Sequence, residues 1–373
     1  MKRKNNDTKN ISLNWLGKSI PDNSSFPADT AKNTKVIDDN RNRLYLGDNK
    51  DLMASLLKAG LTGKINMIYI DPPFGIGDDR HIEASDGITE QKAYADNWSN
   101  NLDVYLQMMY ERLSLMKGLL AADGSIYVHL DYHTSHYIKV IMDELFGRDN
   151  LVNQIIWQRT GAHNDPQAFG RNYDIILFYQ KSTKRIWNKP LVDYDEAHLK
   201  RYFRQDTAGR WYRLNNPTGK GYQDHTRNFG HGPVKPPRDR HWSVTQAQID
   251  KWVAEDRIVF TNSGYPFVKK YLDELPGKPL QSIWTDLIPP RSSRELTGFP
   301  TQKPEKLLAR IIQASSNPGD LIADFFCGSG TTLVVAEKLG RRWLGCDSSD
   351  VAIKIAMERL KKIKNITSFE ILG

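Results

Sequence analysis

Two short polar segments, each following an apolar run, constrain this chain more than any other feature of its sequence. Residues 71–74 (Asp-Pro-Pro-Phe) follow the apolar run 65–70, and residues 324–330 (Asp-Phe-Phe-Cys-Gly-Ser-Gly) follow the run 321–323. Both runs have the length and composition of buried β-strands. Ligands of α/β proteins bind at the carboxyl ends of such strands. The two segments therefore predict an α/β fold whose site is assembled from distant parts of the chain.

Apolar strands alternate with amphipathic helices along most of the sequence. We expect strands at 43–46, 65–70, 125–130, 152–157, 175–179, 321–326 and 342–346, and helices at 51–59, 102–120, 138–145, 304–312 and 331–339. This alternation predicts a doubly wound, Rossmann-like parallel sheet with helices on both faces. No period emerges between residues 75 and 100, where we expect a long loop.

The composition excludes several other classes of protein. Hydrophobic residues make up 39% of the 373 residues, which is typical of a globular protein. Two cysteines are too few for a disulfide framework or a cysteine-based zinc cluster. No apolar run reaches the roughly 20 residues of a membrane span, and no signal-peptide pattern opens the sequence. We therefore expect a cytoplasmic protein without a membrane partner.

The positive charge is concentrated in one segment. Residues 181–310 contain 24 Lys and Arg against 14 Asp and Glu, a surplus of ten in a chain of net charge +8. They also hold 16 of the 38 aromatic residues. Basic residues interleaved with aromatic ones suit a phosphate backbone and unstacked bases, so they predict a nucleic-acid surface rather than only a solvated basic face. The candidate DNA-binding residues are Arg201, Arg204, Arg210, Lys220, Arg238 and Arg240.

Segment 324–330 has the features of a loop that holds a nucleoside. Gly328 and Gly330 let the backbone approach a ligand closely. Strand 342–346 ends on Asp347, 17 residues after Gly330, where a carboxylate accepts hydrogen bonds from ribose hydroxyls. A turn without a ligand is the simpler alternative. The loop lacks the third glycine of a dinucleotide site, so it predicts S-adenosylmethionine rather than NAD.

The segment 71–74 suits the methylation of an exocyclic amine. Such an amine on adenine or cytosine is a poor nucleophile, because its lone pair is delocalised into the ring. Two acceptors for its N–H bonds, the Asp71 carboxylate and the Pro72 carbonyl, would direct the lone pair at a methyl donor. Pro72 and Pro73 fix the backbone, and Phe74 would stack on the base. Alone, such a segment is more often a strand-terminating turn.

Together the two motifs resemble the amino-methyltransferases that modify DNA adenine N6 or cytosine N4. Because the chemistry motif precedes the cofactor motif, the chain resembles their circularly permuted β group, which includes type III restriction-modification methylases. Gly47-Asp48, residues 124–131 and residues 301–304 (Thr-Gln-Lys-Pro) extend the match. The family often has Pro at the position of Phe325 and Tyr at that of Phe74.

The resemblance implies a methyltransferase core with an inserted target-recognition domain. It places Asp48 near the adenine of the cofactor, Asp347 at its ribose and Lys303 near its methionine end. Residues 1–35 are polar and without sustained periodicity, so we expect a flexible arm there, with Leu13, Trp15 and Leu16 as candidate anchor. The parts implied for the rest of the chain are a catalytic half (36–180), a target-recognition region (181–300) and a cofactor half (301–373). The implied cofactor-binding residues are Asp48, Lys303, Asp324, Phe326, Gly328, Gly330, Thr331 and Asp347.

The resemblance also implies an activity: methyl transfer from S-adenosylmethionine to N6 of a flipped adenine in duplex DNA, with Asp71, Pro72, Pro73 and Phe74 as catalytic residues. It allows a cognate restriction subunit and a homodimer. Cytosine N4 methylation, RNA methylation and a catalytically silent DNA reader stay open as alternatives. His129, Asp131, His133 and His136 cluster in the sequence, but methyl transfer needs no metal, and we expect none.

Overall fold

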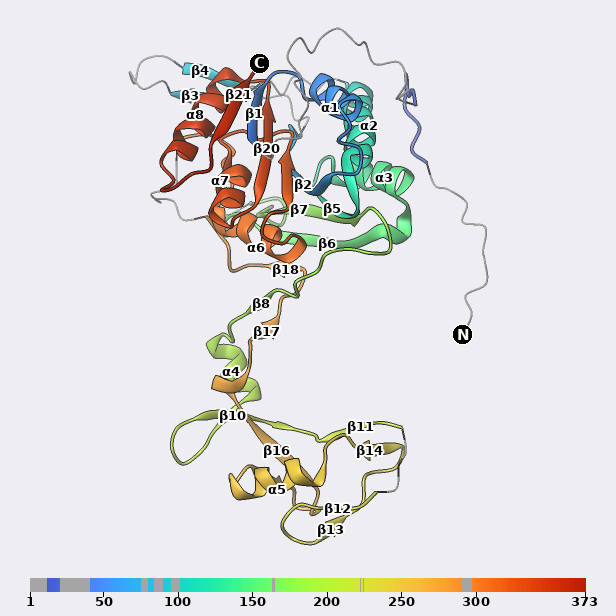
Figure 1. Cartoon of the computed structure of the whole chain (residues 1–373), viewed down its shortest axis with the longest axis vertical. Helices are drawn as coiled ribbons and strands as arrows, with labels where there is room; N and C mark the ends of the chain where they lie inside the picture. Colours follow the sequence, from blue (N-terminus) through green and yellow to red (C-terminus); the bar gives the residue numbers. More distant parts are fainter. Residues whose placement is uncertain are drawn as a thin grey trace. The chain divides into compact units, whose positions relative to one another are not determined.

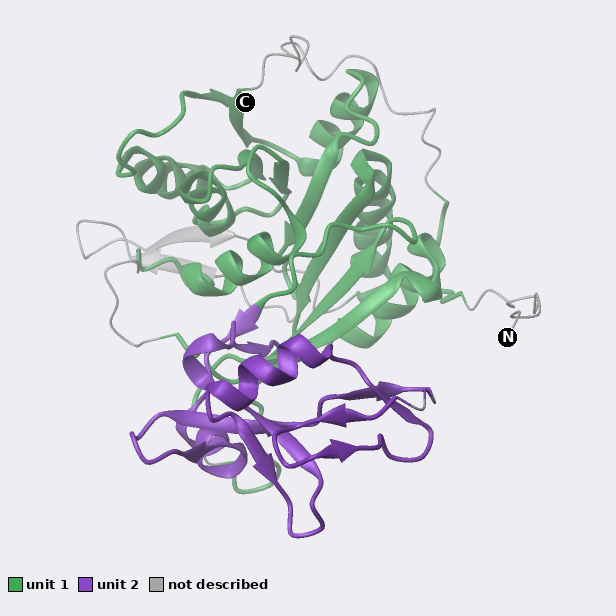
Figure 2. Cartoon of the chain, turned by 60° about the horizontal axis from the view of Figure 1, so that its bottom comes forward, with its two compact units in different colours: residues 1–190, 281–373 green, residues 191–280 purple. Residues whose placement is uncertain are grey.

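The computed structural model describes residues 12–20, 41–74, 80–83, 90–94, 101–162, 165–221, 223, 225–289 and 297–373. The chain divides into two compact units (Figure 2). Unit 1 combines residues 1–190 with 281–373, and unit 2 comprises residues 191–280. Each unit is described by itself below.

In the described part of unit 1, nine strands form one sheet (Figure 1). Their spatial order is β18 (Ile283–Trp284), β6 (Leu151–Gln158), β7 (Tyr173–Gln180), β5 (Leu120–Leu130), β2 (Ile65–Ile70), β19 (Leu321–Asp324), β20 (Arg342–Asp347), β1 (Asn42–Leu46) and β21 (Phe369–Leu372). The two strands that precede the polar motifs, β2 and β19, are parallel neighbours at the centre. Their register pairs Ile68 with Ala323, so Asp71 and Asp324 emerge from the same edge of the sheet.

One strand runs against the predicted direction. β7 is antiparallel to both β5 and β6, whereas the sequence predicted a parallel sheet. The described connection between β6 and β7 contains no helix to carry the chain back across the sheet, so β7 returns directly beside β6. The remaining strand pairs of this sheet are parallel.

The helices cover both faces of the sheet, as predicted for a doubly wound fold (Figure 1). One face carries α1 (Asn49–Lys58), α2 (Leu102–Leu119) and α3 (Ser135–Phe146), and the other α6 (Glu305–Ser315), α7 (Thr331–Lys338) and α8 (Asp350–Lys361). A short 3-10 helix, η1 (Arg148–Asn150), follows α3. In α6 the apolar residues Leu307, Leu308, Ile311 and Ile312 are all buried, because this spacing puts them on one helical face. The sequence analysis had not identified α8 or β21.

Part of the N-terminal arm packs on unit 1. Leu13 and Trp15 lie against the main apolar core, and the Trp15 ring meets that of Tyr110 edge to face at 5.6 Å. Lys18 forms an ion pair of 2.8 Å with Glu144 of α3. Leu16, the third candidate anchor, is 88% exposed and therefore does not anchor the arm.

Unit 2 is built from short strands and two helices in its described residues. These are β8 (Leu191–Val192), α4 (Glu196–Tyr202), β9 (Arg204–Gln205), β10 (Trp211–Asn215), β11 (Thr218–Lys220), β12 (Arg227–Asn228), β13 (Pro233–Val234), β14 (Arg240–Trp242), α5 (Gln246–Ala254), β15 (Ile258–Phe260), β16 (Pro266–Tyr271), η2 (Leu272–Glu274) and β17 (Lys278–Pro279). Phe229, Trp242 and Ile249 form a small core of its own.

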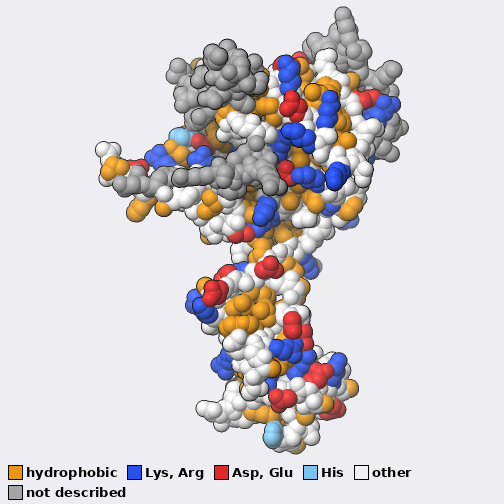
Figure 3. Space-filling view, turned by 90° about the vertical axis from the view of Figure 1, so that its left-hand side faces the viewer, with side chains coloured by type: hydrophobic (Ala, Val, Ile, Leu, Met, Phe, Trp, Pro, Cys, Tyr) orange, Lys and Arg blue, Asp and Glu red, His pale blue; other side chains and the backbone are white. Residues whose placement is uncertain are grey.

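Unit 2 is shorter than the segment 181–300 that the sequence predicted as a separate region. Residues 281–289 return to unit 1, because β18 pairs with β6 and extends the main sheet. The charge divides accordingly: unit 2 contains 15 Lys and Arg against 11 Asp and Glu, so it carries four of the ten surplus charges. Figure 3 shows basic and acidic side chains interspersed over this unit.

The region 75–100 was predicted to be a loop, but two strands lie within it. β3 (Arg80–Glu83) and β4 (Glu90–Tyr94) pair with each other in an antiparallel hairpin. None of the helices in the described part of the chain combines the length and apolar character of a membrane span.

Candidate active site

The loop after β19 requires glycine at its last position. Gly330 has φ +74°, which L side chains rarely adopt, and a Cβ there would come within 2.7 Å of the Ala356 Cβ of α8. The loop therefore packs tightly on α8, and the chain enters α7 directly at Thr331. A side chain at position 330 would force the loop away from α8.

Asp324 fastens the two ends of this loop. Its carboxylate accepts hydrogen bonds from the Phe326 backbone N–H at 3.1 Å and from the Thr332 hydroxyl at 2.5 Å. Burial raises the pKa of Asp324 to about 7, with smaller contributions from the negative charges of Asp71 and Asp347. Asp324 therefore acts mainly as a hydrogen-bond acceptor that holds the loop together.

Asp347, at the end of β20, lies beside the same loop. Its Oδ2 accepts from the Gly328 N–H at 2.9 Å, and its Oδ1 accepts from the Ser349 N–H at 2.9 Å. Burial raises the pKa of Asp347 above its usual range. Each carboxylate oxygen keeps a second lone pair, so these bonds leave acceptor capacity for a ligand hydroxyl.

Asp48 joins the site from the end of β1. It caps α1, accepting from the Lys50 N–H at 2.7 Å, and it pairs with the Arg112 guanidinium of α2 at 3.1 Å. The same guanidinium donates to Asn49 Oδ1 at 2.5 Å, and Asn49 in turn donates to the Phe325 carbonyl at 2.7 Å. Arg112 and Asn49 thus connect Asp48 to the loop that follows β19. The only sequence signal for Arg112 was a basic residue within the apolar pattern of α2.

Asp71 follows β2 and forms an ion pair with Lys303, which precedes α6. The pair uses Asp71 Oδ2, and both side chains are largely buried, with 14% of Asp71 and 10% of Lys303 exposed. The other oxygen, Oδ1, is buried and has no hydrogen-bond partner among the described residues. The Lys303 ammonium also lies 5.8 Å from the centre of the Phe74 ring. The resemblance had placed Lys303 near the cofactor, whereas its partner in the structure is the candidate catalytic acid.

A buried chain of hydrogen bonds lies behind Asp71. The Tyr69 hydroxyl lies 2.8 Å from His129 Nδ1, and His129 Nε2 lies 3.1 Å from Asp174 Oδ2. Burial would raise the pKa of Asp174, but its bond to His129 and the charges of His129, Lys303 and Arg159 lower it. An ionised Asp174 accepts the Nε2 proton of His129, and Nδ1 of the same ring shares a hydrogen bond with the Tyr69 hydroxyl.

The network places Tyr69 in the cavity wall two residues before Asp71. Burial, and then the negative charge of Asp71, raise the pKa of the Tyr69 hydroxyl, which stays protonated. The sequence had grouped His129 with Asp131, His133 and His136 as a conceivable metal cluster. In the structure His129 is committed to Tyr69 and Asp174, while His133 pairs with Asp131.

Arg359 of α8 is a site residue that the sequence analysis missed. It is buried, and its Nη1 donates to the Ser329 carbonyl at 2.9 Å and to the Thr331 hydroxyl at 2.8 Å. Its Nη2 donates to Glu305 at 3.2 Å. Arg359 therefore holds residues 327–330, called the glycine loop below, from the side of α8.

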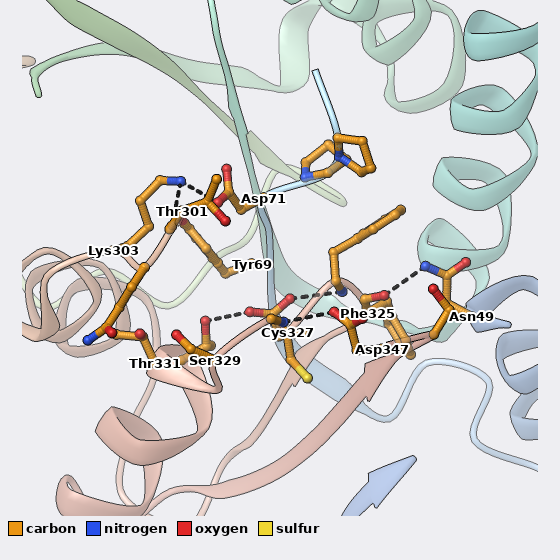
Figure 4. A pocket seen from close by; sticks show the side chains of 18 of the residues that line it. Asn49, Tyr69, Asp71, Thr301, Lys303, Phe325, Cys327, Ser329, Thr331 and Asp347 are labelled. Carbon is orange, nitrogen blue, oxygen red and sulfur yellow. Dashed lines mark hydrogen bonds and ion pairs between the residues drawn. The ribbon is translucent and has the colours of Figure 1, made fainter. Parts of the chain in front are cut away.

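Motifs from both ends of the chain line one cavity of about 290 Å³ (Figure 4). Of the predicted catalytic and cofactor-binding residues, the cavity wall includes Asp48, Asp71, Pro72, Pro73, Phe74, Lys303, Asp324, Phe326, Gly328, Thr331 and Asp347. Gly330 is adjacent to this wall and shapes the loop. Residues that the sequence analysis had not selected also line it: Asn49, Tyr69, Met108, Arg112, Phe299, Thr301, Gln302, Leu308, Phe325, Cys327, Ser329, Thr332 and Ser348.

The predicted DNA-binding residues all lie in unit 2, in two different situations. Arg201, Arg204, Lys220 and Arg238 are exposed. Arg210 pairs with Asp273 at 2.9 Å, and Arg240 donates to Thr218. Arg240 is therefore partly engaged in holding β14 against β11.

Comparison with known proteins identifies the family. A family model described as DNA methylase matches residues 65–358. The type II methyltransferase M.EcaI of Enterobacter cloacae is 33% identical over 342 residues, which cover 89% of this chain and 72% of that protein. The Mod subunit of the type III restriction-modification enzyme StyLTI of Salmonella typhimurium is 29% identical over 82% of this chain. The match spans only 51% of that subunit.

Among solved structures, PvuII DNA methyltransferase (cytosine-N4-specific) is similar over 89% of this chain and 95% of that one, with 14% identity and a TM-score of 0.48. The family assignment rests on the sequence matches, which extend over both motifs and the segment between them. They confirm the resemblance drawn from the motifs, and the chain belongs to the DNA methylase family.

Proposed function

We propose that this chain is a site-specific DNA methyltransferase that methylates N6 of a flipped adenine in duplex DNA. One observation carries the proposal: Asp71 and residues 327–329 of the glycine loop line the same cavity. The same pocket thus contains a carboxylate that can accept from an amine and a loop that suits a nucleoside. That is the arrangement a methyl donor and a nucleobase need.

The residues of the cavity fit S-adenosylmethionine, the methyl donor of this family. Glycine at position 330 lets the loop pack directly on α8, where a side chain would clash with Ala356. Asp347 and Asp48 line the cavity and offer carboxylate oxygens to hydroxyl and amine donors. When bound, S-adenosylmethionine supplies a methyl group made electrophilic by its sulfonium. We assign Asp48, Asp347 and the loop to holding it.

Asp71 orients the amine that receives the methyl group. Its Oδ1 is buried and has no partner among the described residues, so it is placed to accept one N–H of the amine. The Lys303 ammonium pairs with Oδ2 and so holds the carboxylate in place with Oδ1 as the remaining acceptor. The Pro72 carbonyl is the second candidate acceptor, and Phe74 is the candidate stacking partner. As the new N–C bond forms, the amine loses one N–H proton, and we assign Asp71 as the base that accepts it.

Adenine is proposed over cytosine because of the identity of residue 71. The cytosine enzymes that the chain resembles more often have Ser at this position, where this chain has Asp71. A base in a duplex must leave the stack before its amine reaches a buried carboxylate, so the proposal includes base flipping. Unit 2 is the proposed target-recognition unit.

The test is expression of the wild type and of Asp71→Ala in a host without adenine methylases. Genomic DNA is digested to nucleosides for mass spectrometry and sequenced to map modified bases. We expect N6-methyladenine at one short sequence with the wild type and none with Asp71→Ala. Methylcytosine alone would refute the choice of base. Modified RNA with unmodified DNA would establish the RNA alternative, and sequence-specific binding without any modification would establish a silent reader.

The resemblance also allows a cognate restriction subunit and a homodimer, and both remain predictions. Co-purification with the product of a neighbouring gene and the mass of the purified protein in solution test them.

A further inference from the structure

The connection between β6 and β7 emerges at the same edge of the sheet as Asp71. β5 runs parallel to β2, and β7 is antiparallel to both β5 and β6. β6 therefore points in the same direction as β2, and the residues that follow it lie on the carboxyl edge. The described part of this connection adjoining β7, residues 165–172, is called the edge loop below.

Phe169 of the edge loop is 98% exposed, the highest value among the exposed large apolar residues of the described chain. A single exposed apolar residue is common on protein surfaces and needs no explanation by itself. Its surroundings make this one informative. The preceding turn is closed by Asp165, whose carboxylate accepts from the Gln167 N–H at 3.0 Å and the Ala168 N–H at 3.1 Å.

The other side of Phe169 is fixed to the sheet edge. The Arg171 guanidinium lies 4.5 Å from the centre of the Tyr132 ring and donates to the Tyr132 hydroxyl at 2.5 Å. The Tyr132 ring in turn contacts the His133 ring at a tilt of 34°, with centroids 3.8 Å apart. Tyr132 directly follows Asp131 at the end of β5. Phe169 thus lies exposed between the hydrogen-bonded turn at Asp165 and the contact of Arg171 with Tyr132.

The surface around Phe169 has the chemistry of a nucleic-acid contact. Three cationic or titratable side chains are exposed at this edge, namely Arg159, Arg171 and His133. The Asp165 carboxylate accepts hydrogen bonds from the loop backbone. Tyr132 and Tyr173 add partly exposed aromatic rings. Cations beside aromatic faces suit phosphates and unstacked bases. None of the residues named here was selected by the sequence analysis as a DNA contact.

A flipped base leaves a gap in the duplex, and apolar side chains inserted between bases stabilise such distorted DNA. We propose that Phe169 enters the base stack of the target duplex at the gap left by the flipped base, while Arg171 contacts the adjoining backbone. This inference rests on the proposed function. It assigns a duplex-contacting surface to unit 1 in addition to unit 2.

The experiment compares wild type, Phe169→Ala and Phe169→Leu on a short duplex carrying the mapped site. One duplex has the target base paired, and a second has it opposite an abasic site, where the base is already unpaired. Phe169→Ala should lower kcat/KM on the paired duplex by roughly 10-fold to 100-fold, with most of the loss recovered on the abasic duplex. The kcat/KM of Phe169→Leu, which keeps an apolar wedge, should lie between the values of the wild type and Phe169→Ala. Leu16→Ala, at another highly exposed apolar position in the N-terminal segment, should match the wild type on both duplexes.

A second readout does not depend on methyl transfer. With 2-aminopurine in place of the target adenine, binding of the wild type should raise its fluorescence as the base unstacks, and Phe169→Ala should raise it less. Equal fluorescence and equal kcat/KM for wild type and Phe169→Ala would overturn the inference. So would a loss of equal size on the paired and abasic duplexes. A wild type that methylates no duplex refutes the proposed function instead, and the fluorescence comparison still decides the role of Phe169.

Discussion

Lys303, which precedes α6, forms an ion pair with Asp71 at the end of β2, although 232 positions separate them in the chain. The pair joins the cofactor half to the chemistry half of the site. It occupies one oxygen of Asp71 and leaves Oδ1 buried without a partner among the described residues. This asymmetry divides the carboxylate into an oxygen held by the protein and an oxygen available to a substrate.

Asp71→Ala should lower methyl transfer by about 100-fold to 1,000-fold, because it removes a hydrogen-bond acceptor at the reacting centre. The dissociation constant for S-adenosylmethionine, measured by calorimetry, should change little. Near-normal turnover in a folded Asp71→Ala protein would contradict the proposed mechanism.

Lys303→Ala should act mainly on turnover rather than on cofactor affinity, because the ammonium contacts Asp71 in the structure. Loss of the ammonium leaves Oδ2 of the buried carboxylate without its cation and removes the contact that orients Asp71. The turnover of the variant should fall, while the dissociation constant for S-adenosylmethionine, measured by calorimetry, should change little. A large increase in the dissociation constant with unchanged turnover would instead support the position near the methionine end that the resemblance implied.

Asp324→Asn should change how stability depends on pH. The folded pKa of Asp324 is raised to about 7, whereas an unfolded Asp titrates near about 3.9. A raised pKa favours the folded state fully below the unfolded value, and that contribution is lost as pH rises through the folded value. The wild type should therefore lose up to a few kcal/mol between about pH 4 and pH 7 relative to Asp324→Asn.

Urea unfolding at several pH values without cofactor measures this difference. Asp350→Asn is the control, because Asp350 is exposed on α8 and pairs only across the helix surface with Lys354. It should keep the wild-type slope. An unchanged slope in Asp324→Asn would show that Asp324 is ionised in the folded protein across this range.

Arg359→Ala should weaken binding of S-adenosylmethionine roughly tenfold, because charge-assisted hydrogen bonds that hold the glycine loop are lost. Arg359 is a positioning residue, since its partners are loop residues. Lys354→Ala on the same helix replaces an exposed cation and is the matched control. Calorimetric titration of both variants gives the comparison. Equal affinities of the two variants for S-adenosylmethionine would show that Arg359 does not position the loop for cofactor binding.

Arg201→Ala together with Arg204→Ala should weaken binding to DNA of any sequence. Each lost phosphate contact should reduce the slope of log affinity against log salt by about 0.9. Arg210→Ala should have a smaller effect, because that guanidinium already pairs with Asp273 and lies 3.8 Å from the Tyr271 ring centre. Fluorescence anisotropy over a salt series measures the slopes, and slopes unchanged from the wild type would assign the phosphate contacts elsewhere.

The sequence by itself determined the parts of this protein that depend on neighbours in the chain. The apolar runs 65–70 and 321–323 lie in strands because a short run of apolar residues bounded by turn residues favours a buried strand. The polar motifs that follow them occupy strand ends for the same local reason. Their residue types were enough to predict the doubly wound fold, the cofactor and the family, all of which are confirmed.

Tertiary structure alone decided which distant groups meet. The antiparallel direction of β7 depends on its hydrogen bonds to β5 and β6 rather than on its own apolar pattern. The partners of Lys303, His129 and Arg359 lie on other elements, and nothing in the spacing of a sequence encodes a contact between elements that pack only after folding. The exposure of Phe169 has the same origin, because a phenylalanine is buried or presented to solvent according to what the rest of the fold leaves beside it.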